Sequence, residues 1–482
     1  MGSEEIDGVW QRGIKLKRLG FITSLLAILQ VAILGAQEEH AHHPAANEQL
    51  GRVHFPISCS EAVRERFGQA VATLHSFWYE EAERTFTEVT REDPACGMGY
   101  WGIAMSLYHP LWEPPDTRAL ERGRAAVEKA RSVAGGTARE RDYIAAIEAF
   151  YRESDRLDHP TRALAYEKAM ARVHARYPED REAALFYALA VRANAPPSDK
   201  TYARQKRAAE LLGDVLAEQP DHPGVAHYLI HAYDHPGLAS LALDAARRYS
   251  RIAPAVPHAL HMPSHIFTRL GLWRESIDSN LATVAAAKEY ARRTGMQGVW
   301  SEQLHAMDYL TYAYLQRGQD REAERVLADL REIRQAAQPA QAAAYALAAI
   351  PARYALEKRD WASAVSLAPS PPEFPWGKYA WAEAITVFAR ALGAARTGEP
   401  AVARGEIERL AALRDELRGA RDEYWADQVE IQRLAAAGWL AQAEGKREEA
   451  LQLMRGAADL EDATDKHPVT PGPILPAREL LG

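Results

Sequence analysis

The chain has 482 residues, a net charge of −8 and 47% hydrophobic residues, which is enough apolar material for an extensive core. It contains no basic stripe with interleaved aromatic residues, so we expect no nucleic-acid partner. Alanine, leucine, arginine and glutamate dominate, and no run of alternating β-branched residues predicts a sheet. The composition therefore predicts an all-α protein.

The N-terminal segment has the pattern of a secretory signal. A basic stretch precedes an apolar run from Leu19 to Ala36, and the sequence then returns abruptly to polar residues. We predict a signal peptide over residues 1–36. An uncleaved membrane anchor is the alternative, because the run is about as long as a short membrane span. Residues 37–52 are expected to be a flexible lead-in, and residues 53–482 are expected to form the ordered domain.

The chain has two cysteines, Cys59 and Cys96. If the protein is exported, an oxidising compartment allows them to form a disulfide. Two buried free thiols are the alternative.

Helix–turn–helix patterns follow from residue 53 onward. In the first unit, Ala82 is small where two helices would cross, Phe86 packs one turn later, and Pro94 ends the second helix. Further helices are predicted over 137–152, 160–176, 180–194 and 199–218, and a last helix is predicted to start within 476–482. Repeat units are expected to begin near residues 97, 223, 257 and 304. Turns are expected at Gly271, Gly318, Lys358–Trp361, Thr397–Pro400 and Glu444–Arg447.

Two histidine pairs stand out because they are displaced copies of one another. His227 and His231 are four residues apart, as are His261 and His265, and this spacing puts both imidazoles of a pair on one helix face. The offset between the pairs is 34 residues (261 − 227 and 265 − 231). This is the period of the tetratricopeptide repeat, so we predict a right-handed α-solenoid of such helix–turn–helix units.

The sequence resembles a group of bacterial exported tetratricopeptide-repeat proteins of uncharacterised function. The resemblance rests on the blocks Asp93-Pro94-x-Cys96, Tyr100-Trp101-Gly102, His109-Pro110-Leu111-Trp112, His227-Tyr228-Leu229-Ile230-His231-x-Tyr233-Asp234, Pro257-His258-Ala259-Leu260-His261-Met262-Pro263-Ser264-His265-Ile266-Phe267, His305-x-x-Asp308-Tyr309 and Pro476-Ala477-Arg478-Glu479. It implies the solenoid fold over residues 53–482 and a periplasmic location, or an inner-membrane anchor with the domain facing the periplasm.

The resemblance also implies which side chains line the concave groove of the solenoid. In this repeat family, positions 2, 5, 9, 12 and 13 of each first helix face the groove. The histidines and carboxylates at these positions are His75, His109, His227, His231, Asp234, His235, His258, His261, His265, His305 and Asp308. His54, His159, His174, His222 and His467 are assigned to the surface or to loops.

Imidazole is the commonest metal ligand, and it suits copper, zinc or iron. We predict that His227, His231, His261 and His265 bind a transition metal. The remaining groove residues would be additional ligands or would orient the ligands by hydrogen bonds. Whether such a site is catalytic is left open by the sequence.

Two other interpretations remain open for the same histidines. The groove can bind a peptide, a partner protein or a small molecule without any metal. The histidines can also form a buried polar network that fixes the superhelix, with Tyr228, Tyr233 and Tyr309 as partners.

Overall fold

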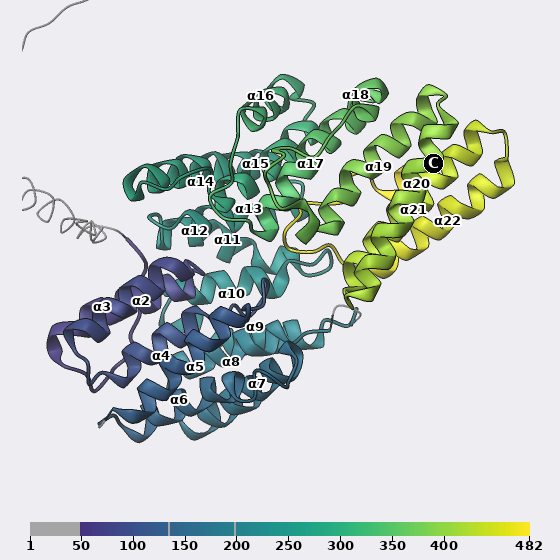
Figure 1. Cartoon of the computed structure of the whole chain (residues 1–482). Helices are drawn as coiled ribbons and strands as arrows, with labels where there is room; N and C mark the ends of the chain where they lie inside the picture. The colour runs from purple at the N-terminus through teal and green to yellow at the C-terminus, as the bar shows by residue number, and fades with distance from the viewer. Residues whose placement is uncertain (1–48, 134, 197–198) are drawn as a thin grey trace, which may run out of the picture. The chain divides into compact units, whose positions relative to one another are not determined.

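A computed structural model describes residues 49–133, 135–196 and 199–482, which belong to one compact unit (Figure 1). The predicted signal peptide or anchor at 1–36 and most of the lead-in lie outside these residues. Packing begins inside the predicted lead-in, because Leu50 is buried and the Arg52 N–H donates to the Asp221 carbonyl. No helix in the described part of the chain is both long and apolar enough to cross a membrane.

Every regular element of more than one residue in the described ranges is a helix. The first half contains α2 (Glu61–His75), α3 (Tyr79–Glu92), α4 (Gly97–Ser106), α5 (Thr117–Ser132), α6 (Ala138–Tyr151), α7 (His159–Arg176), α8 (Arg181–Ala193), α9 (Ala203–Glu218), α10 (Pro223–Tyr233), η1 (Ala239–Ala242) and α11 (Leu243–Ile252). The second half contains α12 (Pro257–His261), α13 (Pro263–Arg269), α14 (Trp273–Thr294), α15 (Ser301–Gln316), α16 (Asp320–Arg331), α17 (Gln341–Glu357), α18 (Trp361–Val365), η2 (Trp376–Lys378), α19 (Ala380–Thr397), α20 (Pro400–Gly419), α21 (Glu423–Ala443), α22 (Arg447–Ala463) and α23 (Ala477–Leu481).

The predicted all-α solenoid of tetratricopeptide-like units is confirmed. Small residues let paired helices approach closely, as at Gly102, where an added Cβ would lie 2.2 Å from the Phe86 ring. The predicted turns at Gly271 and Gly318 both have positive φ, of 69° and 66°, a conformation that glycine adopts without a steric penalty.

The helix that was expected to begin at residue 257 is divided in two. Pro263 has no N–H to donate to the preceding turn, so α12 ends at His261 and α13 begins at Pro263. Met262 between them keeps helical dihedrals (φ −53°, ψ −36°). His261 and His265 therefore retain the spacing of a continuous helix and still share one face.

The apolar core has two large parts, one spanning Leu50 to Trp300 and the other Ile277 to Ala477. The histidine-bearing helices α10, α12 and α13 belong to the first part, and α15 belongs mainly to the second. The histidine blocks therefore lie where the two parts of the core meet.

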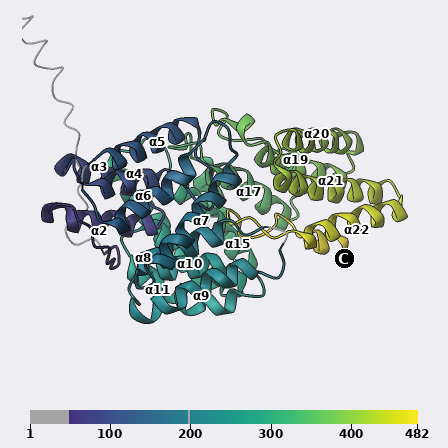
Figure 2. The same ribbon diagram turned by 90° about the horizontal axis from the view of Figure 1, so that it is seen from below.

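The segment after α22, residues 464–476, does not form a helix, and we call it the C-terminal strap. Figure 2 shows it leaving the last helices and running back toward α15. The Tyr309 hydroxyl donates to the Thr470 carbonyl over 3.3 Å, and the Arg353 guanidinium donates to the carbonyls of Gly472 and Pro473. The strap thus crosses α15 and α17 on the side that the histidines face.

Candidate metal centre

The predicted histidines converge in two groups of three. The first cluster contains His227 and His231 of α10 with His258 of α12, and the second contains His261 of α12, His265 of α13 and His305 of α15. In each cluster one ligand nitrogen from each residue lies within 4.8 Å of the others. Each cluster consists of an i, i+4 pair and a histidine from the next repeat, and all six side chains are buried.

In the second cluster, the tautomer of His261 is fixed by Asn280 of α14. The Asn280 side-chain amide donates to the Ser276 carbonyl over 2.7 Å, so its oxygen is the atom that faces the imidazole. That oxygen lies 2.7 Å from His261 Nδ1. Because an amide oxygen can only accept, His261 Nδ1 carries the hydrogen and its Nε2 carries a lone pair.

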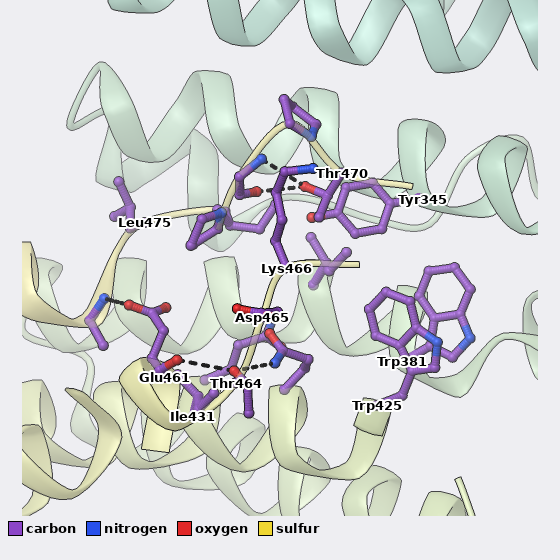
Figure 3. Close-up of a pocket in the computed structure, with 18 of the residues that line it drawn as sticks. Tyr345, Trp381, Trp425, Ile431, Glu461, Thr464, Asp465, Lys466, Thr470 and Leu475 are labelled. Carbon is purple, nitrogen blue, oxygen red and sulfur yellow. Dashed lines mark hydrogen bonds between the residues drawn. The ribbon is translucent and has the colours of Figure 1, made fainter. Parts of the chain in front are cut away.

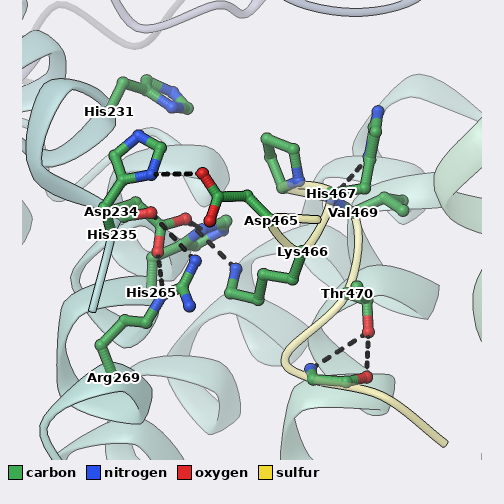
Figure 4. A network of polar contacts seen from close by, with 12 residues as sticks. His231, Asp234, His235, His265, Arg269, Asp465, Lys466, His467, Val469 and Thr470 are labelled. Carbon is green, nitrogen blue, oxygen red and sulfur yellow. Dashed lines mark hydrogen bonds and ion pairs between the residues drawn. The ribbon is translucent and has the colours of Figure 1, made fainter. Parts of the chain in front are cut away.

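The tautomer of His265 is fixed by Asp234, whose carboxylate oxygen lies 2.9 Å from His265 Nδ1 (Figure 4). Burial alone would raise the Asp234 pKa, but the charges of Lys466 and Arg269 and the hydrogen bond from His265 outweigh it and hold this pKa well below its usual value. The ionised carboxylate accepts the Nδ1 hydrogen, which leaves a lone pair on His265 Nε2.

These two lone pairs point at the same place. His261 Nε2 and His265 Nε2 are 3.0 Å apart, and neither carries a hydrogen in the tautomers that their partners impose. The Tyr309 hydroxyl lies 3.4 Å from both ring nitrogens of His265, but it donates its one hydrogen to the Thr470 carbonyl and so does not satisfy the Nε2 lone pair. Such an arrangement requires an additional proton or another cation between the two nitrogens.

An additional proton is disfavoured by burial, which lowers the pKa of His265 and lowers that of His261 well below 6.5. A metal ion fits the geometry. Two imidazole nitrogens at the usual 2.0–2.1 Å from one ion are about 2.8–3.4 Å apart for bond angles of roughly 90–110°. The third member, His305, contributes a buried Nδ1 that has no hydrogen-bond partner in the described part of the chain.

The first cluster has a similar arrangement, but the tautomer of only one histidine of its i, i+4 pair is fixed by a partner. His227 Nδ1 donates to the His75 carbonyl over 2.7 Å, and His227 Nε2 lies 3.0 Å from His231 Nε2. His258 Nδ1 lies 3.1 Å from a carboxylate oxygen of Glu302, and its buried Nε2 has no hydrogen-bond partner. Among the residues that the structure describes, no comparable partner fixes the His231 tautomer, so an N–H···N hydrogen bond also accounts for this pair.

A third histidine group is complete without any ion. His75 and His222 lie 2.8 Å and 3.0 Å from the two oxygens of Glu182, and His75 Nδ1 lies 2.8 Å from the Tyr228 hydroxyl. His222 Nδ1 accepts from the Gly224 N–H. Although burial raises the Glu182 pKa, the two histidines outweigh it and lower this pKa to about 2. His222 was assigned to the surface or to a loop; it lies in the loop before α10, but it is not on the surface, because its side chain is the buried N-cap of α10.

The remaining candidates lie outside the two clusters. Asp234 and His235 follow α10, and His235 Nδ1 lies 3.4 Å from Asp465 of the strap. His109 stacks on Tyr79 with ring centroids 4.2 Å apart. Asp308 is fully buried 3.7 Å from Arg353 Nε, and burial raises its pKa to about 6 although the Arg353 charge opposes this.

Sequence reasoning missed several residues that position the ligands. Asn280 lies on a second helix, Glu302 precedes the groove position of α15, and Lys466 comes from the strap, where its ammonium lies 3.3 Å from the Asp234 carboxylate (Figure 4). None of them stands at a repeat-related groove position, so the 34-residue period gave no signal for them.

The strap also lines a larger cavity of about 390 Å³ (Figure 3). Lys466 and Thr470 of the strap and Tyr345, Trp381 and Trp425 of the second core line this cavity. None of the six cluster histidines lines it.

Cys59 and Cys96 form a disulfide that joins the segment before α2 to the start of α4.

No protein-family model matches the sequence, and a comparison with curated proteins finds no match. Among solved structures, the chain is similar to a human IFIT1 dimer with PPP-AAAA (13% identity, 82% of this chain and 72% of that chain covered, TM-score 0.33). It is also similar to a human IFIT1 dimer with m7Gppp-AAAA (14%, 82% and 81%, TM-score 0.36) and to Naa15/Naa10 bound to HypK-THB (12%, 82% and 58%, TM-score 0.25). The sequence identities and TM-scores are too low for a ligand or an activity of these proteins to be assigned to this chain.

Proposed function

We propose that this protein holds transition-metal ions at its two histidine clusters. The observation that carries the proposal is the 3.0 Å approach of His261 Nε2 to His265 Nε2 with both Nδ1 hydrogens already committed to Asn280 and Asp234. A shared cation removes the repulsion between the lone pairs. Copper, zinc or iron suits three neutral imidazoles, whereas magnesium and calcium prefer oxygen ligands.

The chain supports the ligands as metalloproteins commonly do. Asn280 orients His261, Asp234 orients His265, and Glu302 orients His258, each through the nitrogen that faces away from the cluster. Three protein ligands leave room for a further ligand on an ion, and an ion bound in this way can activate water or polarise a substrate. The proposal includes no particular reaction.

Binding of a peptide in the groove is supported less well. The chain's own strap lies across α15 and α17, and its Lys466 forms an ion pair with Asp234 next to the second cluster. A peptide on this part of the groove would have to displace the strap.

We also propose that the protein is exported to the periplasm. The Cys59–Cys96 disulfide supports this, because oxidising compartments favour such bonds. The basic and apolar N-terminal sequence is the second support.

The deciding experiment is elemental analysis of full-length protein purified from its native compartment without a histidine tag. We expect near-stoichiometric copper, zinc or iron, which disappears or falls by about half in a His261→Ala/His265→Ala variant with unchanged helical content. A His54→Ala/His174→Ala variant removes the same number of imidazoles outside the clusters and should retain all the metal. Absence of metal from the wild type, even after soaking and desalting, would overturn the proposal.

A further inference from the structure

A separate small cavity, of about 110 Å³, lies beside the histidine clusters. His231, His258, His265 and His305 form part of its lining. His258 and His305 are each more than nine-tenths buried, and each has a ring nitrogen without a hydrogen-bond partner. The lining therefore includes polar groups that the described residues leave unsatisfied.

Aromatic side chains form another part of the lining, and Phe77 and Trp112 lie in ring contact with His231 and His258. The aromatic residues are Phe77 and Trp78 in the turn between α2 and α3, Tyr79 at the start of α3, Trp112, and Trp300 before α15. Aromatic rings are poor ligands for a metal ion, but their faces attract organic cations and pack against apolar groups.

Three carboxylates also line the cavity: Glu80, Glu113 and Glu302. No lysine or arginine is among the described residues that line it. Glu302 has a buried carboxylate oxygen without a hydrogen-bond partner. Burial raises the Glu113 pKa, the Gln341 N–H opposes this, and the charge of Glu302 raises it further. The negative charge of the cavity is therefore not compensated by a cationic side chain.

The backbone around Trp112 is held in an unfavourable conformation. His109 and Glu113 have φ values of 47° and 51°, which non-glycine residues rarely adopt. The Glu113 carboxylate is fixed by the Gln341 N–H at 2.5 Å. Strained backbone of this kind is often found where side chains are presented to a ligand.

We propose that this cavity binds a small organic ammonium ion, such as a primary amine with a short apolar or aromatic body. The ammonium group would lie near Glu80, Glu113 and Glu302, and the apolar body would pack on Trp112 and Trp300. An anion would meet uncompensated carboxylates. A neutral analogue would gain the aromatic contacts without the charge interaction. The inference does not require a metal, although the ligand would lie next to any ion held by the clusters.

The test uses chelator-treated, desalted full-length protein, so that metal binding does not enter the result. Benzylammonium is titrated while tryptophan fluorescence and heat are recorded, with benzyl alcohol and benzoate as matched neutral and anionic probes. We expect benzylammonium to bind at least about tenfold more tightly than either, because a hydrogen bond to a charged group contributes roughly that factor or more.

Glu113→Gln and Glu80→Gln are the test variants, and each keeps the shape of the side chain. At least one of them should weaken benzylammonium binding about tenfold or more. Glu179→Gln is the matched control, because its side chain is 92% exposed and lies outside the cavity, and it should bind like the wild type. Melting temperatures of all variants verify folding.

Equal binding of the three probes, no binding of benzylammonium, or wild-type affinity in both test variants would overturn the proposal. Metal content is measured on separate, untreated samples, so a protein without metal that still binds benzylammonium would overturn only the proposed metal site.

Discussion

Two buried histidine groups in this protein use similar residues but differ in which ring nitrogens carry a hydrogen and which have a hydrogen-bond partner. In the His75–Glu182–His222 network, the carboxylate receives one hydrogen bond from each imidazole, and the remaining nitrogens are bonded to Tyr228 and Gly224. In the second cluster, the outward nitrogens of His261 and His265 carry the hydrogens, and the inward nitrogens face each other with lone pairs only.

The comparison shows that burial and proximity alone do not identify a metal site. Both groups bring potential ligand atoms within 4.8 Å of one another. The His75–Glu182–His222 network is satisfied by its own hydrogen bonds and is structural, whereas the second cluster needs a cation between its nitrogens. The two groups differ in whether each nitrogen lone pair has a hydrogen to accept. The following predictions test that difference.

The largest expected effect is on metal affinity in His265→Ala. Removing a ligand should weaken binding at the second cluster by about 100-fold or more, since even loss of an orienting partner typically costs 10–100-fold. Competition with a chromophoric chelator measures the affinity. His75→Ala is the control and should retain the metal. Equal losses in both variants would show that the two groups do not differ in the proposed way.

Glu182→Ala should affect stability instead. It leaves the buried imidazole N–H groups of His75 and His222 without their acceptor, and each such group costs about 1–3 kcal/mol. We expect the free energy of unfolding in urea to fall by about 3 kcal/mol, with no change in metal stoichiometry. Glu179→Ala, at an exposed position, should change it by less than about 0.5 kcal/mol. Loss of metal in Glu182→Ala would instead make the network part of the metal site.

Asn280→Leu tests the tautomer argument without removing a ligand. Without the amide oxygen, His261 loses the acceptor that holds the hydrogen on Nδ1, and metal affinity should fall about 10–100-fold. Asn280→Asp keeps an acceptor at the same place and should lose much less affinity. If the leucine and aspartate variants bind metal equally well, the side chain does not fix the imidazole as proposed.

The smallest effect is the pH dependence of the metal-free protein. Burial lowers the pKa of His261 and His265, so below pH 6.5 the unfolded chain binds protons that the folded chain does not. The contribution of neutral His261 and His265 to the free energy of unfolding is therefore present above pH 6.5. It is lost as the pH falls, by about 1.4 kcal/mol per pH unit for each proton that only the unfolded chain binds. Urea titrations between pH 7.5 and about pH 5 should show a shallower slope in His261→Leu.

Glu182 should act in a different pH range. Its folded-state pKa of about 2 lies below the ordinary value of 4.5, so its stabilisation is complete above pH 4.5 and is lost as the pH falls toward 2. A stability loss near pH 6 that is the same in wild type and His261→Leu would contradict the assignment of the lone pairs.

The solenoid and the helix face on which the histidines lie can both be predicted from the amino-acid sequence. Helical periodicity, the turns at Gly271 and Gly318 and the 34-residue offset are local properties of the chain, so they can be read without the fold. The pairing of His227 with His231 and of His261 with His265 followed from the same helical spacing, and it persisted across the break at Pro263.

The grouping of the histidines and the identity of their free nitrogens depend on contacts between helices that are distant in sequence. His258 and His305 join clusters from the next repeat, and Asn280 and Asp234 set the tautomers of the second cluster. The position of His222 in a buried network and the path of the strap were also decided at this level. The physical reason is that a hydrogen bond depends on atoms from helices that are distant in sequence, and no local pattern specifies which of them face one another.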